Sequence, residues 1–194
     1  MEVIRFNLDD LKNNLDGFSC YILGRSYDLE ENGVTADYEK ALKYYEEGMQ
    51  KGDPLCEYSI GISKILGLGD VLDKDPVGGT KLLIDAYPKI NEIINNENTP
   101  DIERIYAKFV TGAYYYYGLG NIDKNDNKAF EIINECAEKG HIAAIYDLGA
   151  NFYYKGVGTE QDLEKAKYYL NIACEEGLPR AIQKYNEYGF NQTK

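Results

Sequence analysis

The chain has 194 residues, of which 44% are hydrophobic, and it carries a formal net charge of −12 at pH 7. This length and composition suffice for one domain or one array of repeats. The acidity argues against a nucleic-acid partner, whose phosphates need a basic surface, and equally against an anionic membrane, and it permits a basic protein partner. The alternative meaning of the acidity is that it only keeps the protein soluble.

No stretch of the sequence approaches the roughly 18 consecutive apolar residues that span a membrane. The opening residues, MEVIRFNLDD, contain neither the basic nor the apolar region of a signal peptide. We therefore expect a cytoplasmic protein.

Residues 1–17 match no repeat, and we expect them to form an N-terminal cap, since repeat arrays need polar ends. The spacing of Leu8, Leu11 and Leu15 predicts a short amphipathic helix. Either Asn7 or Asp9 would begin it as the N-cap residue.

Residues 18–52 predict two short antiparallel helices joined by a turn. The first helix should run to about Leu29, and Gly33 lies in the turn, where glycine readily adopts a positive φ. Asp37 stands where the second helix needs an N-cap. Such a hairpin cannot bury both of its faces alone, so we expect further copies beside it.

Residues 53–104 form a degenerate second repeat with an insertion at about 87–99. Asp75 followed by Pro76 predicts the start of its second helix, because proline is tolerated at the first helical position. Pro88 should break or kink that helix. The insertion is predicted to be a lengthened helix and a loop, with a lid or an extra contact surface as the alternative.

Residues 105–140 and 141–177 predict two further hairpins, whose second helices should be capped by Asp126 and Asp162. Gly149 lies inside a predicted helix, where glycine costs about 1 kcal/mol relative to alanine, so we expect another helix to approach it closely at Ala166. Residues 178–194 should form a C-terminal capping helix and a frayed tail.

The fourth hairpin contains the pattern A-x-x-x-L-G-x-x-[FY]-x-x-G-x-G…D-x-x-K-A…A-x-x-G within residues 144–177, and Gly140-His141 opens it. Matching features recur 37 and 125 residues earlier. This pattern resembles the Sel-one-like repeat, a relative of the tetratricopeptide repeat, over residues 18–188. The resemblance implies an all-α, right-handed α-solenoid of about four hairpins with caps at both ends, forming a single array over residues 1–194.

No motif in the sequence predicts catalysis, a cofactor or a metal. The single histidine, His141, stands at a predicted helix start, where capping explains it better than catalysis, which would need a nucleophile or carboxylate partner. Two acidic turns, 70–75 and 121–126, raise the possibility of a calcium site. The second has the 1, 3, 5 spacing of a calcium-binding loop, but it lacks the glycine and the glutamate that such a loop requires, so the aspartates are better explained as helix caps. The four cysteines fall one per repeat, which favours small buried thiols in a reducing compartment over a zinc site.

Tyrosine is unusually frequent, with 19 residues. The simplest explanation is an AT-rich genome, in which tyrosine is expected to be plentiful. A subset is nevertheless predicted, at about 100° per residue, to face away from the partner helix of its own hairpin. In tetratricopeptide relatives that face lines a concave, peptide-holding groove. The predicted binding face comprises Tyr21, Arg25, Asp28, Tyr58, Ile62, Lys108, Tyr115, Tyr116, Tyr146, Tyr153 and Tyr154. The alternative is that these residues pack between repeats or line an unused groove.

The resemblance and the tyrosines together predict a non-enzymatic, bacterial protein-interaction module that binds a peptide or protein segment on this face. We expect a monomer or weak self-association. One alternative is an acidic regulatory or toxin-neutralising, immunity-like partner of a basic protein. A remote alternative is a hydrolase-like enzyme.

Overall fold

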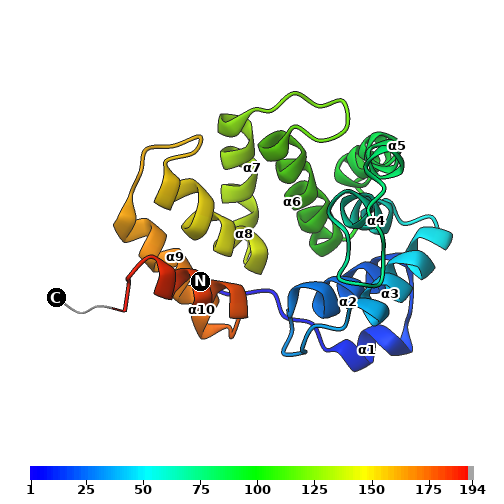
Figure 1. The fold of residues 1–194 in the computed structure, drawn as a ribbon, viewed down its shortest axis with the longest axis horizontal. Coiled ribbons are helices and arrows are strands. Elements are labelled where there is room, and N and C mark those ends of the chain that lie inside the picture. The colour runs from blue at the N-terminus through cyan, green and yellow to red at the C-terminus, as the bar shows by residue number, and fades with distance from the viewer. Residues whose placement is uncertain (192–194) are drawn as a thin grey trace. The chain divides into compact units, whose positions relative to one another are not determined.

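The computed structural model describes residues 1–191, and the end of the predicted tail lies outside them. Over these residues the chain consists of helices joined by turns and loops, with one isolated bridge between Leu68 and Leu72 (Figure 1). Successive helices pack as antiparallel hairpins. The predicted all-α class, an α-solenoid of helical hairpins, is confirmed.

The chain divides into two compact units. The N-terminal unit contains Arg5–Ala107 and Leu119–Ile122, and the C-terminal unit contains Met1–Ile4, Lys108–Gly118 and the chain from Asp123 onward. Helix α6, Asp101–Tyr117, contributes its first part to the N-terminal unit and its last part to the C-terminal unit.

The N-terminal unit is built from two hairpins, α2 with α3 and α4 with α5, and α3 also packs on α4. The short helix α1 lies against α2. The helices are α1 (Leu8–Asn13), α2 (Gly17–Leu29), α3 (Tyr38–Gln50), α4 (Pro54–Leu66) and α5 (Pro76–Asn95).

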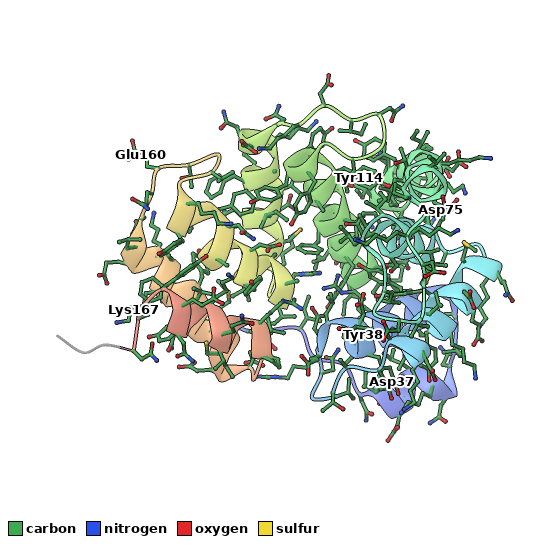
Figure 2. All side chains as sticks on the ribbon, viewed as in Figure 1. Asp37, Tyr38, Asp75, Tyr114, Glu160 and Lys167 are labelled. Carbon is green, nitrogen blue, oxygen red and sulfur yellow. The ribbon has the colours of Figure 1, made fainter. Side chains whose placement is uncertain are left out.

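Three helices of this unit begin at capping residues that the sequence predicts, whereas α2 and α4 begin at Asp16 and Asp53, which were not predicted as caps. The side chains of Asn7, Asp37 and Asp75 accept hydrogen bonds from backbone N–H groups in the first turns of α1, α3 and α5. Figure 2 labels Asp37 and Asp75 at these starts. Each cap satisfies an N–H group that the helix itself cannot pair.

The prediction that Pro88 breaks or kinks its helix is wrong about the break, because α5 continues through it from Pro76 to Asn95. Proline inside a helix costs about 3 kcal/mol. Pro88 is exposed, and the opposite face of the helix buries Leu83, Ala86 and Ile90. Burial of these three side chains offsets the cost of the proline and holds both halves of the helix in place.

The C-terminal unit adds α7 (Asp126–Glu138), α8 (Ile142–Asp147), the π-helix η1 (Leu148–Tyr153), α9 (Leu163–Glu175) and α10 (Pro179–Glu187). The predicted cap Asp162 is confirmed. The predicted cap Asp126 is wrong by one residue, since Asn125 accepts the hydrogen bond from Lys128 N. Asn125 has the extended backbone that an N-cap requires, whereas Asp126 is already helical.

The π-helix η1 continues directly from α8, and the stretch from the glycine that faces the partner helix to the glycine of the following turn is one residue longer here than in the third hairpin. Gly112 and Gly149 are 37 residues apart, whereas Gly118 and Gly156, at the following turns, are 38 apart. A π-turn accommodates such an extra residue inside a helix. No sequence rule for regular helices predicts it.

Residues 1–4 belong to the C-terminal unit, where Val3 is buried and Ile4 N donates a hydrogen bond of 2.9 Å to the Gly140 carbonyl oxygen. Gly140 has φ +84°, and a Cβ there would meet the Glu2 carbonyl oxygen. Glycine is therefore required at this position for two reasons, the positive φ and the close approach of the chain.

A buried ion pair lies in the N-terminal unit. Arg25 Nη2 donates to Glu31 Oε1 at 2.7 Å and Arg25 Nε donates to Glu31 Oε2 at 3.2 Å, with both side chains almost fully buried. Burial alone would lower the pKa of Arg25, but the Glu31 carboxylate and the nearby phenol groups raise it well above its usual range. The guanidinium therefore stays charged, and the Glu31 carboxylate offsets the free-energy cost of burying that charge.

We expect Glu31→Gln to lower the free energy of unfolding by about 3 kcal/mol or more, because it leaves a buried guanidinium without its counter-charge. Urea denaturation followed by circular dichroism measures this. The control is Glu187→Gln, which removes an ion pair with Lys184 on the surface and should change the stability little. Equal effects of the two variants would contradict the structural role of the buried pair.

We expect Gly149→Ala to destabilise the protein by about 1–3 kcal/mol through overpacking, although alanine is the better helix former. A Cβ at Gly149 would lie 2.8 Å from Leu170 Cγ and 2.9 Å from the Ala166 carbonyl oxygen, and a backbone oxygen cannot move aside. Thermal denaturation checks the prediction, with the exposed Lys167→Ala as control. A stability equal to the wild type would mean that α9 does not press on Gly149.

Candidate functional site

Three of the predicted binding residues face the partner helix of their own hairpin, so their predicted orientation is wrong. Lys108 Nζ lies 2.6 Å from Glu135 Oε1 on α7. The Tyr115 hydroxyl accepts a hydrogen bond of 2.7 Å from Lys128 of α7. Tyr153, only 7% exposed, stacks on the ring of Tyr169 from α9 at 5.7 Å.

The error has a physical reason. The prediction assumed that Leu148 faces the partner helix. In the structure the residues that face it most closely are Gly112 in the third hairpin and Gly149 in the fourth. A Cβ at Gly112 would lie 2.7 Å from Ile133 Cδ1 on α7. Lys108 and Tyr115 stand four residues before and three residues after Gly112, and such positions share one face of a helix.

The predicted residues of the N-terminal unit do not form one open surface. Tyr21 is fully buried and Arg25 is 6% exposed, because both belong to the cluster around the buried ion pair. Asp28 accepts a hydrogen bond of 3.2 Å from the Tyr45 hydroxyl. Tyr58 and Ile62 are half-buried on α4.

The remaining predicted residues, Tyr116, Tyr146 and Tyr154, come together in the C-terminal unit. They lie on the first helices of the third and fourth hairpins and are half-buried. Two tyrosines that the sequence analysis did not select, Tyr117 and Tyr188, lie with them. We call this group the tyrosine surface. It consists of Tyr116, Tyr117, Tyr146, Tyr154 and Tyr188.

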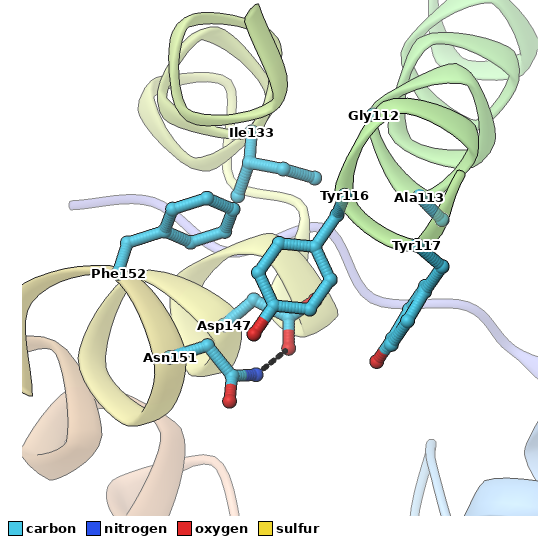
Figure 3. Close-up of a pocket in the computed structure, with 8 residues that line it drawn as sticks. All are labelled: Gly112, Ala113, Tyr116, Tyr117, Ile133, Asp147, Asn151 and Phe152. Carbon is cyan, nitrogen blue, oxygen red and sulfur yellow. Dashed lines mark hydrogen bonds between the residues drawn. The ribbon is translucent and has the colours of Figure 1, made fainter. Parts of the chain in front are cut away.

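A small pocket opens on the tyrosine surface between α6 and η1, and its volume of about 20 Å³ has room for about one water molecule (Figure 3). The rings of Tyr116 and Tyr117 stand at 89° to one another with centroids 4.7 Å apart. The ring of Phe152 lies 5.3 Å from that of Tyr116. Tyr117 is 64% exposed and forms the outer wall.

Asp147 provides the charge of the pocket. Asn151 Nδ2 donates a hydrogen bond of 3.0 Å to Asp147 Oδ1, so the amide orients the carboxylate (Figure 3). Loss of water and then the negative charge of Asp147 raise the pKa of Tyr116, and the same two causes raise the pKa of Tyr117 to about 12. Both phenols therefore stay neutral at physiological pH.

The other end of the tyrosine surface is formed with α10. The rings of Tyr154 and Tyr188 stack with centroids 3.3 Å apart, and the Tyr188 hydroxyl donates to the Ala150 carbonyl oxygen at 2.9 Å. Arg180 lies 5.1 Å from the centroid of the Tyr146 ring. Stacking and this hydrogen bond fix α10 beside the fourth hairpin.

Sequence reasoning missed Asp147, Asn151 and Tyr117. Asp147 and Asn151 are four residues apart on one helix, which is a usual spacing for a side-chain hydrogen bond. That spacing was the available signal, but the same spacing is common on exposed helix faces and does not by itself mark a site.

His141 confirms its predicted capping role. It is fully buried, its Nδ1 accepts a hydrogen bond of 3.2 Å from Ala144 N at the start of α8, and its ring stacks on Phe109 at 4.2 Å. Over residues 1–191, no group of three or more His, Cys, Asp or Glu side chains is placed to hold a metal ion.

All four cysteines are free thiols; Cys20, Cys56 and Cys136 are buried and Cys174 is half-buried. Burial raises the pKa of the Cys136 thiol to about 12, which keeps it protonated and unreactive. Among the described helices, none combines the length and the apolar character needed to cross a membrane.

The profile of the Sel1 repeat matches residues 17–53, 105–141 and 142–178, which is more than half of the chain. The chain belongs to the Sel1 repeat family. Sel1 repeat proteins are generally protein-interaction modules without enzymatic activity. A comparison with curated proteins finds no match.

Solved structures with Sel1-type folds are similar to this chain at low identity. A protective antigen of uropathogenic Escherichia coli with an SLR fold is 20% identical, with 96% of this chain and 36% of that chain covered and a TM-score of 0.46. A putative Sel1 repeat protein from Klebsiella pneumoniae is 20% identical, with 93% and 81% covered and a TM-score of 0.44.

An immunity protein from Pseudomonas aeruginosa is 15% identical to this Sel1 repeat chain, with 93% of this chain and 74% of that chain covered and a TM-score of 0.41. Likeness at this level carries no argument about a partner. The chain spans only about a third of the first of these structures, 36% of its length.

We expect Asp147→Asn to lower the pKa of Tyr116, because a neighbouring negative charge opposes formation of the phenolate and its removal relieves that effect. A pH titration of [ζ-13C]tyrosine-labelled protein by NMR measures the change. The control is Tyr44, whose raised pKa arises first from burial and then from Tyr27. An unchanged Tyr116 pKa in the variant would remove Asp147 from the electrostatics of the pocket.

Proposed function

We propose that the C-terminal unit of this Sel1 repeat protein is a non-enzymatic binding module that holds a protein segment on the tyrosine surface. The observation that carries the proposal is the grouping of five tyrosines from α6, α8, the end of η1 and α10. After burial and Asp147, the Tyr146 phenol also raises the pKa of Tyr117, and the Tyr188 phenol also raises the pKa of Tyr116 and Tyr146, so these phenols lie near one another.

Tyrosine suits such a surface because it offers a large apolar ring and a polar hydroxyl with only two rotatable side-chain angles. Tyrosine is also enriched among the residues that dominate the free energy of protein binding. The surface presents phenols, an amide and one carboxylate, and the cations of Arg180, Lys184 and Lys124 lie over its rings. Among the described residues of this surface, no nucleophile is held by a base, and this favours recognition over catalysis.

We further propose a basic partner, in line with the net charge of −12. An acidic protein attracts a basic partner over long range, and salt screens that attraction. A regulatory or toxin-neutralising role, in which the chain blocks a basic protein, is the second candidate function that this charge supports.

The experiment compares the capture of partners from a lysate of the source cell by three forms of the protein. Tyr117→Ala with Tyr154→Ala removes two rings of the tyrosine surface. Tyr38→Ala with Tyr168→Ala is the matched control, since these tyrosines are 40% and 54% exposed and lie outside that surface. We expect a partner held by the wild type and the control to be lost at least tenfold from the first variant, as for residues at the centre of an interface.

Circular dichroism melting of all three forms checks that they are folded equally well. A partner retained equally by both double variants would contradict binding on the tyrosine surface. The capture is repeated at low and at moderate salt, and an affinity that does not fall with salt would contradict a basic partner.

A further inference from the structure

The outward face of α5 carries a row of exposed apolar residues. Val77 and Ile84 stand seven residues apart on this helix, so they lie on one face. Val77 is 84% exposed and Ile84 is 39% exposed. A single exposed aliphatic residue is ordinary, but a row along a helix is a feature of surfaces that contact another protein.

The space above this row is open. The turn at Gly120 borders it on one side, where a Cβ on Gly120 would lie 3.3 Å from Ile84 Cγ1. The result is a shallow groove of about 470 Å³ that runs along Pro76, Val77, Thr80, Lys81 and Ile84. The groove follows two turns of the helix, so a second helix can lie along it.

Two charged residues accompany the row, Lys81 within it and Asp85 beside it. Both are exposed, and within residues 1–191 neither takes part in a salt bridge. Side chains on a helix lean toward its N-terminus, so Lys81 leans away from Asp85, and a lysine four residues before an acid is the less favourable order for pairing. Both charges can therefore pair with another molecule.

This face is complementary to itself. A two-fold axis between Thr80 and Lys81 would place α5 of a second copy antiparallel to the first, so that Val77 of each copy meets Ile84 of the other. Because the two helices then run in opposite directions, each Lys81 leans toward Asp85 of the other copy. Every contact occurs twice, which is the defining property of a two-fold interface.

We propose that this face of α5 docks against the same face of a second copy of the chain as an antiparallel two-fold pair. We call it the α5 face, and it consists of Val77, Thr80, Lys81, Ile84 and Asp85. It lies in the N-terminal unit, so the proposal does not depend on the tyrosine surface. The net charge of −12 on each copy opposes association, and we therefore expect a weak dimer.

Sedimentation equilibrium of the full chain, over concentrations from roughly 10 μM to 1 mM, tests the proposal in the range of weak complexes. We expect a reversible equilibrium between monomer and dimer. Val77→Asp places a carboxylate in the apolar contact, and we expect it to raise the dissociation constant by about tenfold or more. The variant should fold normally, because an acidic residue in the first turn of a helix is favourable.

The matched control is Leu163→Asp, which makes the same kind of change in the first turn of α9. Leu163 is 48% exposed and lies in the C-terminal unit. We expect this control to leave the dissociation constant unchanged. Circular dichroism melting of both variants checks that they are folded.

Two charge reversals test the register of the pair. Lys81→Glu alone brings like negative charges together across the interface, and Asp85→Lys alone brings like positive charges together, so we expect each to weaken the dimer by about tenfold or more. In an equal mixture of the two variants, both cross-copy pairs again join opposite charges. We expect this mixture to form a heterodimer, which native mass spectrometry detects when one variant is 15N-labelled.

A wild-type chain that stays monomeric up to the highest concentration would overturn the proposal. Equal weakening by Val77→Asp and Leu163→Asp would also overturn it, because the effect would then come from added charge and not from the α5 face. A dimer that Val77→Asp leaves intact, or a mixture of the charge reversals that forms no heterodimer, would show that the second copy is not bound in this register.

Discussion

In all four hairpins of the described chain, the second helix lies so close to the first that only glycine fits between them. The glycines are Gly24, Gly61, Gly112 and Gly149, and a Cβ at any of them would lie 2.9 Å or less from a side-chain atom of the facing helix. The distance between the two helices fixes which residues of the first helix are covered. The orientation of the tyrosines on the first helices therefore depends on this contact.

Much of the fold could be predicted because it depends on local chemistry. Caps such as Asp37 and Asp162 stand immediately before their helices, and glycines with positive φ mark the turns. The continuity of α5 through Pro88 could not be predicted, since it depends on apolar side chains that other helices bury. The π-turn of η1 could not be predicted either, because the extra residue leaves no local signature.

The candidate site was harder to predict than the fold for the same reason. A helical projection gives angles between residues but does not say which angle faces the neighbour. Taking Gly149 in place of Leu148 as the facing residue would have placed Lys108 and Tyr115 correctly against α7. Asp147 acquires its role only from its neighbours, Asn151 on its own helix and Tyr116 on α6. The proposed binding surface therefore lies where the first helices of the third and fourth hairpins meet.

The π-helix has a consequence for the modularity of the array. Repeat proteins are commonly treated as interchangeable blocks, so that one unit can be exchanged for another in a chimera. The fourth unit cannot be replaced by the third on that basis, because the third has one residue fewer between its facing glycine and its turn glycine, and this loss would turn every later side chain of the helix by about 100°. Phe152 and Tyr154 would then point in new directions. The directions of these side chains depend on the extra residue of the π-helix, so a chimera that transfers the surface of the fourth unit must also transfer that residue.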